Sequence, residues 1–250
     1  MVVKTVNYKL GFKMLNVMFA DEPTEIKGYD RLYFSLCNKE DNEINAPGFL
    51  KALRYCSIVD ITLPKDKLLF SFNRTTRNLI YRAQESKEFS YEIVQTSESY
   101  KDFFELLNNF IKAKKMWYKP NMSKKDLEDI GNYFICLIRY NSIPVEAGLS
   151  NIEENGDIYT EFMPARRVFE KGYDEICSIA SRYAYYKSME YAREHNGKRF
   201  FFLLGNSIEN PTPLAKFKMS FNGKIIPKYM YVKNYNPLLK AMTRLNVWPA

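Results

Sequence analysis

Two lysines on either side of an aromatic residue are well suited to hold a phosphate group. Lys216 and Lys218 flank Phe217 within residues 214–223. If this segment is extended, both lysines share one face and Phe217 takes the other, because side chains alternate along a strand. The lysines could then clamp a phosphate while Phe217 anchors the strand. The alternative is a surface strand whose lysines are simply solvated.

Arginines supply two further candidate phosphate surfaces. Arg77 lies between Arg74 and Arg82 in a segment with helical spacing, and Arg166 and Arg167 follow a predicted hairpin. The planar guanidinium matches phosphate oxygens well, although charged helix faces are usually only solvated. The net charge of +8 also favours polyanionic partners, unless it reflects only the base composition of the gene.

The rarity of histidine and the spacing of cysteine argue against several classes of site. His195 is the single histidine, so catalytic triads and histidine-based metal sites are disfavoured. The four cysteines lack C-x-x-C spacing, which argues against zinc and disulfide frameworks and favours buried free thiols. Neither a secretory signal nor an apolar run of membrane-spanning length is apparent, so we expect no stable membrane insertion and a cytoplasmic location.

Periodicity along the chain predicts a mixed α/β (α+β) protein. Helical spacing covers residues 68–86, and period-two or continuously apolar runs predict strands between the helices. Asn155-Gly156 can adopt positive φ and should join two strands as a hairpin. The expected strands are residues 12–19, 31–36, 57–63, 90–95, 135–140, 143–151, 157–163 and 198–205, and further helices are expected at residues 99–115, from a capping box at residues 123–126 to residue 134, and from about residue 183 to 196.

Three segments resemble Fem-type aminoacyl and acyl transferases of the GNAT superfamily. The first is R-x-x-I-x-x-A from Arg77 to Ala83, and the second is the hairpin of residues 143–161. The third runs from Ser181-Arg-Tyr through the strand ending at Gly205 to Phe217-Lys218 and Phe221-Asn-Gly223. The chain departs from the family where an aspartate followed by glycines usually ends that strand. It also lacks the glycine-rich phosphate loop of ordinary GNAT acetyltransferases, in whose place residues 165–172 stand.

The resemblance implies a GNAT-like mixed, mostly antiparallel sheet flanked by helices. It further implies a reduced N-terminal lobe in residues 1–90 and a C-terminal acyltransferase lobe in residues 91–250. The implied activity is transfer of an acyl or aminoacyl group from acyl-coenzyme A, or alternatively aminoacyl-tRNA, to a primary amine. That amine would belong to an amino sugar or a cell-envelope precursor.

The resemblance also suggests roles for individual residues. Lys218 and Arg77 would hold phosphates, with Lys216, Arg166 and Arg167 as further cofactor contacts and Phe217 setting the loop. Positional candidates for the base are Glu161 and its hairpin neighbour Glu146, while Tyr229 or Tyr183 could protonate a leaving thiolate. The alternative function is a catalytically inert GNAT-like module that binds RNA or a phosphorylated partner through the same basic surfaces.

Overall fold

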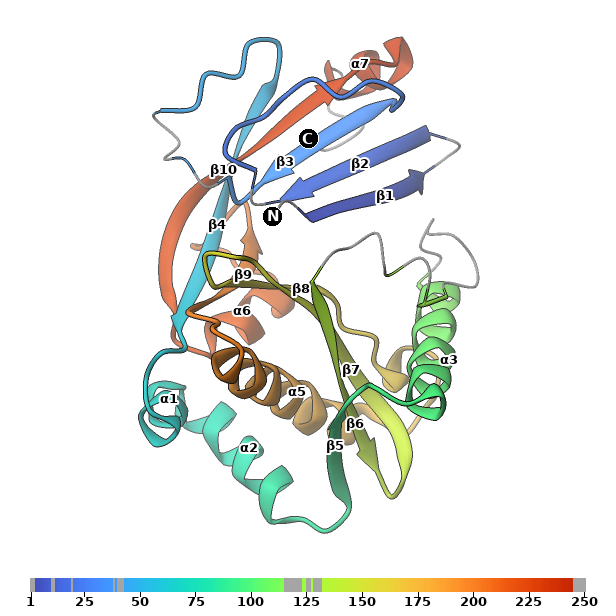
Figure 1. Cartoon of the computed structure of the whole chain (residues 1–250), viewed down its shortest axis with the longest axis vertical. Coiled ribbons are helices and arrows are strands. Elements are labelled where there is room, and N and C mark those ends of the chain that lie inside the picture. The colour runs from blue at the N-terminus through green and yellow to red at the C-terminus, as the bar shows by residue number, and fades with distance from the viewer. Residues whose placement is uncertain are drawn as a thin grey trace.

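A single ten-stranded sheet organises the molecule (Figure 1). The computed structural model describes residues 3–9, 12–18, 20–37, 39, 43–114, 123–124, 127 and 132–244, so most of the helix expected at residues 123–134 lies outside the described residues. In order across the sheet, the strands are β1 (Val3–Lys9), β2 (Phe12–Met18), β3 (Arg31–Ser35), β10 (Lys224–Asn234), β4 (Leu50–Asp60), β9 (Arg199–Gly205), β8 (Asp157–Phe162), β7 (Ile143–Ile152), β6 (Tyr133–Tyr140) and β5 (Phe89–Ile93). Among these strands β2 and β3 pair in parallel, as do β8 and β9, and the other neighbours are antiparallel. The predicted mixed, mostly antiparallel sheet is confirmed.

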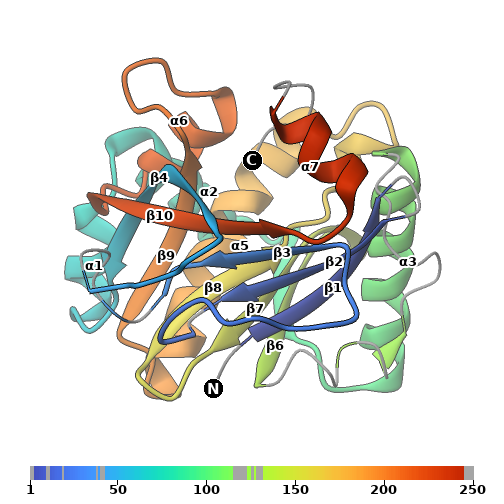
Figure 2. The ribbon, with the colours of Figure 1, turned by 90° about the horizontal axis from the view of Figure 1, so that it is seen from above.

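Helices cover both faces of the β5–β9 half of the sheet. The long helix α5 (Asp174–Glu194) packs on β6 and β7, and α2 (Arg74–Glu85) packs on α5. Helix α3 (Ser97–Ala113) lies on the opposite face, as both views show (Figures 1 and 2). The remaining helical segments are α1 (Lys65–Ser71), the 3₁₀ turn η1 (Arg166–Val168), α6 (Pro213–Met219) beside β9, and α7 (Pro237–Arg244) beside β10.

The continuously apolar run of β9 is explained by burial on both faces. Phe200 and Phe202 join the core beneath α5, whereas Phe201 points into the core beneath α3. Successive side chains of a strand alternate between faces, so a strand covered on both sides needs apolar residues at every position. The helices and strands of this half are therefore held to each other by two separate apolar layers.

The segment predicted as one helix over residues 68–86 is two helices. Helix α1 ends before Phe72, and the side chain of Asn73 accepts a hydrogen bond of 2.8 Å from the Thr76 amide at the start of α2. Asparagine satisfies a free amide of the first helical turn in this way, which favours a new helix start over continuation. Phe72 at the break is buried against Phe221 and Tyr186.

Two further expectations need correction. The crossover helix begins at Asp174, about nine residues before the expected start, with Asp174 and Glu175 in its first turn where carboxylates are favourable. The lysine-flanked segment is not a strand but helix α6. Thr212 caps it by accepting a 3.1 Å hydrogen bond from the Ala215 amide, and Pro213 occupies the first turn.

Strand β10 returns from the C-terminal end of the described chain to lie between β3 and β4. Residues on both sides of the expected boundary near residue 90 thus build the β1-β2-β3-β10-β4 half of the sheet, and the boundary itself stays a prediction. The predicted hairpin of β7 and β8 is confirmed, with Gly156 at φ +88°.

Several local expectations are also met. His195 is the C-terminal cap of α5, and all four cysteines are buried free thiols. In the part of the chain that the structure describes, no helix has both the length and the apolar character needed to cross a bilayer.

Candidate functional site

The parallel strands β8 and β9 separate after three residue pairs. Their ladder joins Asp157–Tyr159 to Arg199–Phe201, and beyond it β8 continues to Phe162 and β9 to Gly205 without pairing to each other. Backbone groups facing such a split are not used by the ladder and can contact a bound molecule. The split therefore lies at the centre of the sheet with polar main chain on both sides.

A β-bulge flanks the split on each side. Between β7 and β8 the register passes from Ser150–Thr160 to Leu149–Phe162, which leaves Glu161 as the extra residue. Between β4 and β9 it passes from Cys56–Leu203 to Tyr55–Gly205, which leaves Leu204 as the extra residue. Bulges increase local twist and re-aim side chains, and they are frequent next to active sites. The two bulges account for the divergence of β8 from β9.

Lys218 reaches the split from α6. Its Nζ donates a 3.0 Å hydrogen bond to the carbonyl oxygen of Leu203, in the part of β9 beyond the last pair with β8. The residue is partly exposed as a whole, but its ammonium group is surrounded by protein. This burial lowers the pKa of Lys218 from 10.5 to about 8, and the nearby Cys56 thiol opposes the shift. Lys218 therefore offers a poorly solvated ammonium group that titrates close to physiological pH.

The helical conformation of α6 separates the two lysines that an extended segment would have placed together. Residues two apart in a helix point to different sides, so Lys216 is exposed while Lys218 turns inward. Phe217 packs against the rings of Tyr185 and Phe221, at centroid distances of 5.9 and 5.8 Å. Phe217 thus fixes α6 against α5, which in turn fixes the position of Lys218.

A second group of charged side chains lies where η1, α5 and β7 meet. The guanidinium of Arg182 lies 4.9 Å from the ring centre of Phe217 and donates a 2.8 Å hydrogen bond to the Ser178 carbonyl. Burial, and then the positive charge of Arg167, lowers the pKa of Arg182. Two arginines that repel each other in this way form a surface suited to an anion.

Glu146 is the buried carboxyl group of this region. It is 2% exposed, and its Oε2 has no hydrogen-bond partner among the described residues. Burial raises the pKa of Glu146 well above its ordinary value, although Arg167 and Ser181 oppose the shift. Glu146 is therefore disposed to hold a proton that an ordinary surface glutamate would have lost.

Replacing Glu146 by glutamine should remove a pH-dependent contribution to stability. Folding raises the pKa of Glu146, so this carboxyl group contributes fully to the free energy of unfolding below about pH 4.5. That contribution is lost as pH rises through the folded-state pKa. Between about pH 4.5 and the folded pKa, the free energy of unfolding of the variant should therefore rise relative to that of the parent by up to about 1.4 kcal/mol per pH unit. Urea unfolding of both proteins between pH 5 and 8 measures this difference. A constant difference across the series would contradict a raised pKa.

Three backbone amides of the segment that precedes α5 already have partners. Within residues 165–170, Val168 donates to the Ala165 carbonyl at 3.1 Å, and Phe169 and Glu170 donate to the Arg166 carbonyl at 3.0 and 2.9 Å. A glycine-rich loop would instead leave its amides free for a pyrophosphate. At these three residues coenzyme A would need side-chain cations, for which Arg167, Arg182 and Lys216 are available.

The remaining predicted site residues lie apart from the split. Arg166 donates to the Pro144 carbonyl at 2.7 Å and pairs with Glu170, so it fastens η1 to β7. Arg77 donates to the Phe70 carbonyl at 3.0 Å and stacks on the Phe70 ring. Tyr229 lies on β10, with the Lys51 ammonium 3.9 Å from its ring centre. Their roles in binding or catalysis stay predictions.

The structure adds one residue that the sequence analysis did not select. Arg182 is the central residue of Ser181-Arg-Tyr, which carried part of the family resemblance, yet its place between Phe217 and Arg167 depends on how α5 and α6 pack. Glu161 and Lys218, by contrast, were both selected and both border the split.

Comparisons with known proteins identify the fold. No protein-family model matches the chain, and no curated protein does. Among solved structures, FemX is 13% identical with a TM-score of 0.61, over 96% of this chain and 85% of FemX. L-PGS from Bacillus licheniformis is 14% identical with a TM-score of 0.60, over 97% of this chain and 88% of that one. The C-terminal domain of a putative lysylphosphatidylglycerol synthetase from Agrobacterium fabrum is 12% identical with a TM-score of 0.58, over 98% of this chain and 88% of that one. The chain therefore has the Fem-like GNAT fold that its sequence predicts.

Proposed function

We propose that this protein of Fem-like GNAT fold transfers an acyl or aminoacyl group from an activated carrier to a primary amine, at the split between β8 and β9. The observation that carries the proposal is the Lys218 ammonium group, buried against the Leu203 carbonyl beyond the last β8–β9 pair. A poorly solvated ammonium there can stabilise negative charge that develops on an attacked carbonyl or on a donor phosphate.

The proposed reaction forms one bond and breaks one. The amine nitrogen attacks the carbonyl carbon, a C–N bond forms, and the C–S bond of a thioester or the C–O bond of a tRNA ester breaks. The amine loses a proton, which Glu161 or a substrate group accepts, and the leaving thiolate or alkoxide gains one. Holding the two reactants in line across the split supplies much of the rate.

Acyl-coenzyme A is the first candidate donor and aminoacyl-tRNA the second. Arg167, Arg182 and Lys216 would contact donor phosphates, since the amides of Val168, Phe169 and Glu170 are engaged in their own turn. The acceptor we propose is an amine of an amino sugar or a cell-envelope precursor. The expected compartment is the cytoplasm, where the four buried thiols would stay reduced.

Thermal unfolding with acetyl-coenzyme A, longer acyl-coenzyme A esters, free coenzyme A and ATP tests the donor. A bound thioester at a hundred times its Kd should raise Tm by roughly 5–10 °C. ATP, as a polyanion control, should give a smaller shift. Arg182→Ala should reduce the thioester effect, whereas Lys112→Ala, at an exposed position on α3, should not. Equal shifts with all four ligands would count against a thioester donor.

The inert binding module is the second candidate function. It is favoured by the engaged loop amides and by the repelling arginines of the α5 face, neither of which requires catalysis. RNA binding measured across a salt series separates the two, because phosphate contacts weaken steeply with salt and do not depend on an acyl group. Steeply salt-dependent binding without acyl transfer to any amine would favour the module.

A further inference from the structure

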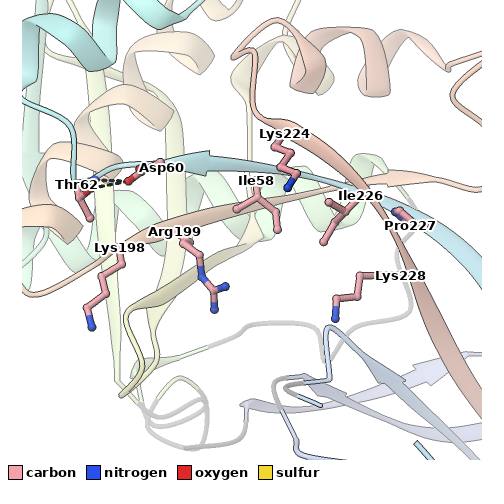
Figure 3. A pocket seen from close by; sticks show the side chains of 9 residues that line it. All are labelled: Ile58, Asp60, Thr62, Lys198, Arg199, Lys224, Ile226, Pro227 and Lys228. Carbon is pink, nitrogen blue, oxygen red and sulfur yellow. Dashed lines mark hydrogen bonds between the residues drawn. The ribbon is translucent and has the colours of Figure 1, made fainter. Parts of the chain in front are cut away.

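Strands β4, β9 and β10 border a hollow of about 650 Å³ on the face of the sheet opposite α5 (Figure 3). Its position follows from the strand pleat: Ile58 and Ile226 belong with the core beneath α3, while Phe200 and Phe202 face α5. The hollow is thus separated by the sheet from the arginines of the α5 face. Its volume lies within the range of about 300–1,000 Å³ found for small-molecule sites.

The lining of the hollow is strongly cationic. Lys198, Arg199, Lys224 and Lys228 contribute four positive charges, and Asp60 contributes the one carboxylate of the lining. The Asp60 carboxylate accepts hydrogen bonds from the Thr62 amide and hydroxyl, at 2.9 and 2.7 Å. The structure shows no ion pair between the three lysines and any described residue, so their charge is left to solvent or to a ligand.

Strand register concentrates this charge. Lys224 and Lys228 are four residues apart on β10 and therefore project from the same face. Lys228 lies directly opposite Arg54 on β4. The pairing of β10 with β4 therefore places Lys224 and Lys228 together with Ile226 on the face that borders the hollow.

Arg199 is already fixed in position. Its Nε and a terminal nitrogen bind the two carboxylate oxygens of Asp157 at 2.6 and 2.8 Å. Because Asp157 neutralises Arg199, the charge available to a ligand comes mainly from Lys198, Lys224 and Lys228. Lysine ammonium groups are common phosphate contacts, and they adjust to the ligand through flexible stems.

We propose that this hollow binds a small organic diphosphate. The three lysines exceed the charge of Asp60 by two, so the hollow keeps a net positive charge that attracts the negative charge of two adjacent phosphates. The apolar side chains of Ile58 and Ile226, with Pro227 beside them, would contact the organic part. A compact hollow on three strands suits a small molecule better than RNA, which requires a longer basic track. The site does not depend on the proposed transfer activity.

Calorimetric titration with inorganic pyrophosphate and with ADP tests the site on the whole chain of 250 residues. Both should bind saturably, and ADP should bind more tightly because its organic part reaches the apolar lining. Lys224→Ala/Lys228→Ala should weaken both affinities at least tenfold. Lys112→Ala/Lys240→Ala removes the same charge from exposed positions on α3 and α7 and should leave both affinities unchanged. Circular dichroism would establish that both double variants are folded.

Three outcomes would overturn the proposal. Equal loss of affinity in the two double variants would show that binding depends on the net charge of the protein and not on the lysines of the hollow. Loss in Arg182→Ala, with the β10 double variant unaffected, would place the diphosphate on the α5 face. Binding of a single-stranded RNA that pyrophosphate does not displace, with no ADP binding, would assign the surface to RNA. Absence of acyl transfer by the parent protein, with pyrophosphate still bound, would contradict only the proposed function.

Discussion

Replacing Lys218 by alanine should reduce acyl transfer at least a hundredfold while leaving the protein folded. The loss follows from removing a buried positive charge at the split, where a single preorganised donor is typically worth about 10²–10³ in rate. Folding lowers the pKa of Lys218, so burial of its charge opposes folding. The variant should therefore unfold at the same temperature as the parent or at a higher one.

The pH dependence of acyl transfer distinguishes two roles for Lys218, as a charged ammonium group and as a neutral base. If the ammonium form is needed, transfer should fall as pH rises through about 8, because the folded enzyme loses that proton there. Lys218→Arg keeps the charge and should abolish this alkaline decline, even if its rate is lower. If Lys218 instead acts as a neutral base, activity should rise through about pH 8. Initial rates between pH 6 and 10 distinguish the two, with Lys112→Ala as control. Full activity in Lys218→Ala would falsify the assignment.

Replacing Glu190 by alanine should lower the free energy of unfolding by about 3–5 kcal/mol, the usual cost of breaking a buried ion pair. Glu190 on α5 binds Lys187 at 2.7 Å and Lys65 at 2.8 Å. Lys187 is 8% exposed and lies over Tyr91, with 4.2 Å between its Nζ and the ring centre. Without Glu190, the Lys187 charge would stay buried with no carboxylate beside it.

Lys65→Ala is the matched comparison for Glu190→Ala. It removes the partly exposed partner of the same carboxylate and should cost less than about 1 kcal/mol. Burial opposes ionisation of Glu190, but hydrogen bonds from Lys187 and Lys65 outweigh it and hold the pKa of Glu190 below its ordinary value. The advantage of the parent over Glu190→Gln should therefore begin to shrink as pH falls below about 4.5, and it should be lost as pH falls through the lower folded pKa. Urea unfolding at pH 7 and pH 4 measures both effects, and equal losses in the two alanine variants would contradict the argument.

Glu190 and Lys218 are connected through the packing of α5. Glu190 and Lys187 fasten α5 to α1 and β5, and the middle of α5 carries Tyr185 and Arg182. Tyr185 packs on Phe217, which sets α6 and so the position of Lys218. A less stable α5 should hold Lys218 less firmly at the split. Glu190→Ala should therefore lower the rate of transfer as well as the free energy of unfolding.

Local patterns in the sequence predicted much of the central fold. Strands β6 to β9, the hairpin turn at Gly156, the cap at His195 and the burial of the cysteines follow from periodicity, turn chemistry and apolar character within short windows. These features are determined by neighbours a few residues apart, which is why the sequence alone reveals them. The family resemblance supplied the fold and favoured Lys218, whereas Glu161 was selected for its position on the central strand.

Tertiary structure decided what these residues can do. The helical form of α6 turned Lys218 inward and left Lys216 in solvent, and strand register made Glu161 a bulge beside the split. The hollow on the opposite face arises because β10 pairs with β4, which sets Lys228 against Arg54 from more than 170 positions away. Such pairings depend on how distant segments share burial and hydrogen bonds. The sequence by itself therefore determined the elements and the chemistry available, while only the folded sheet decided which charges meet.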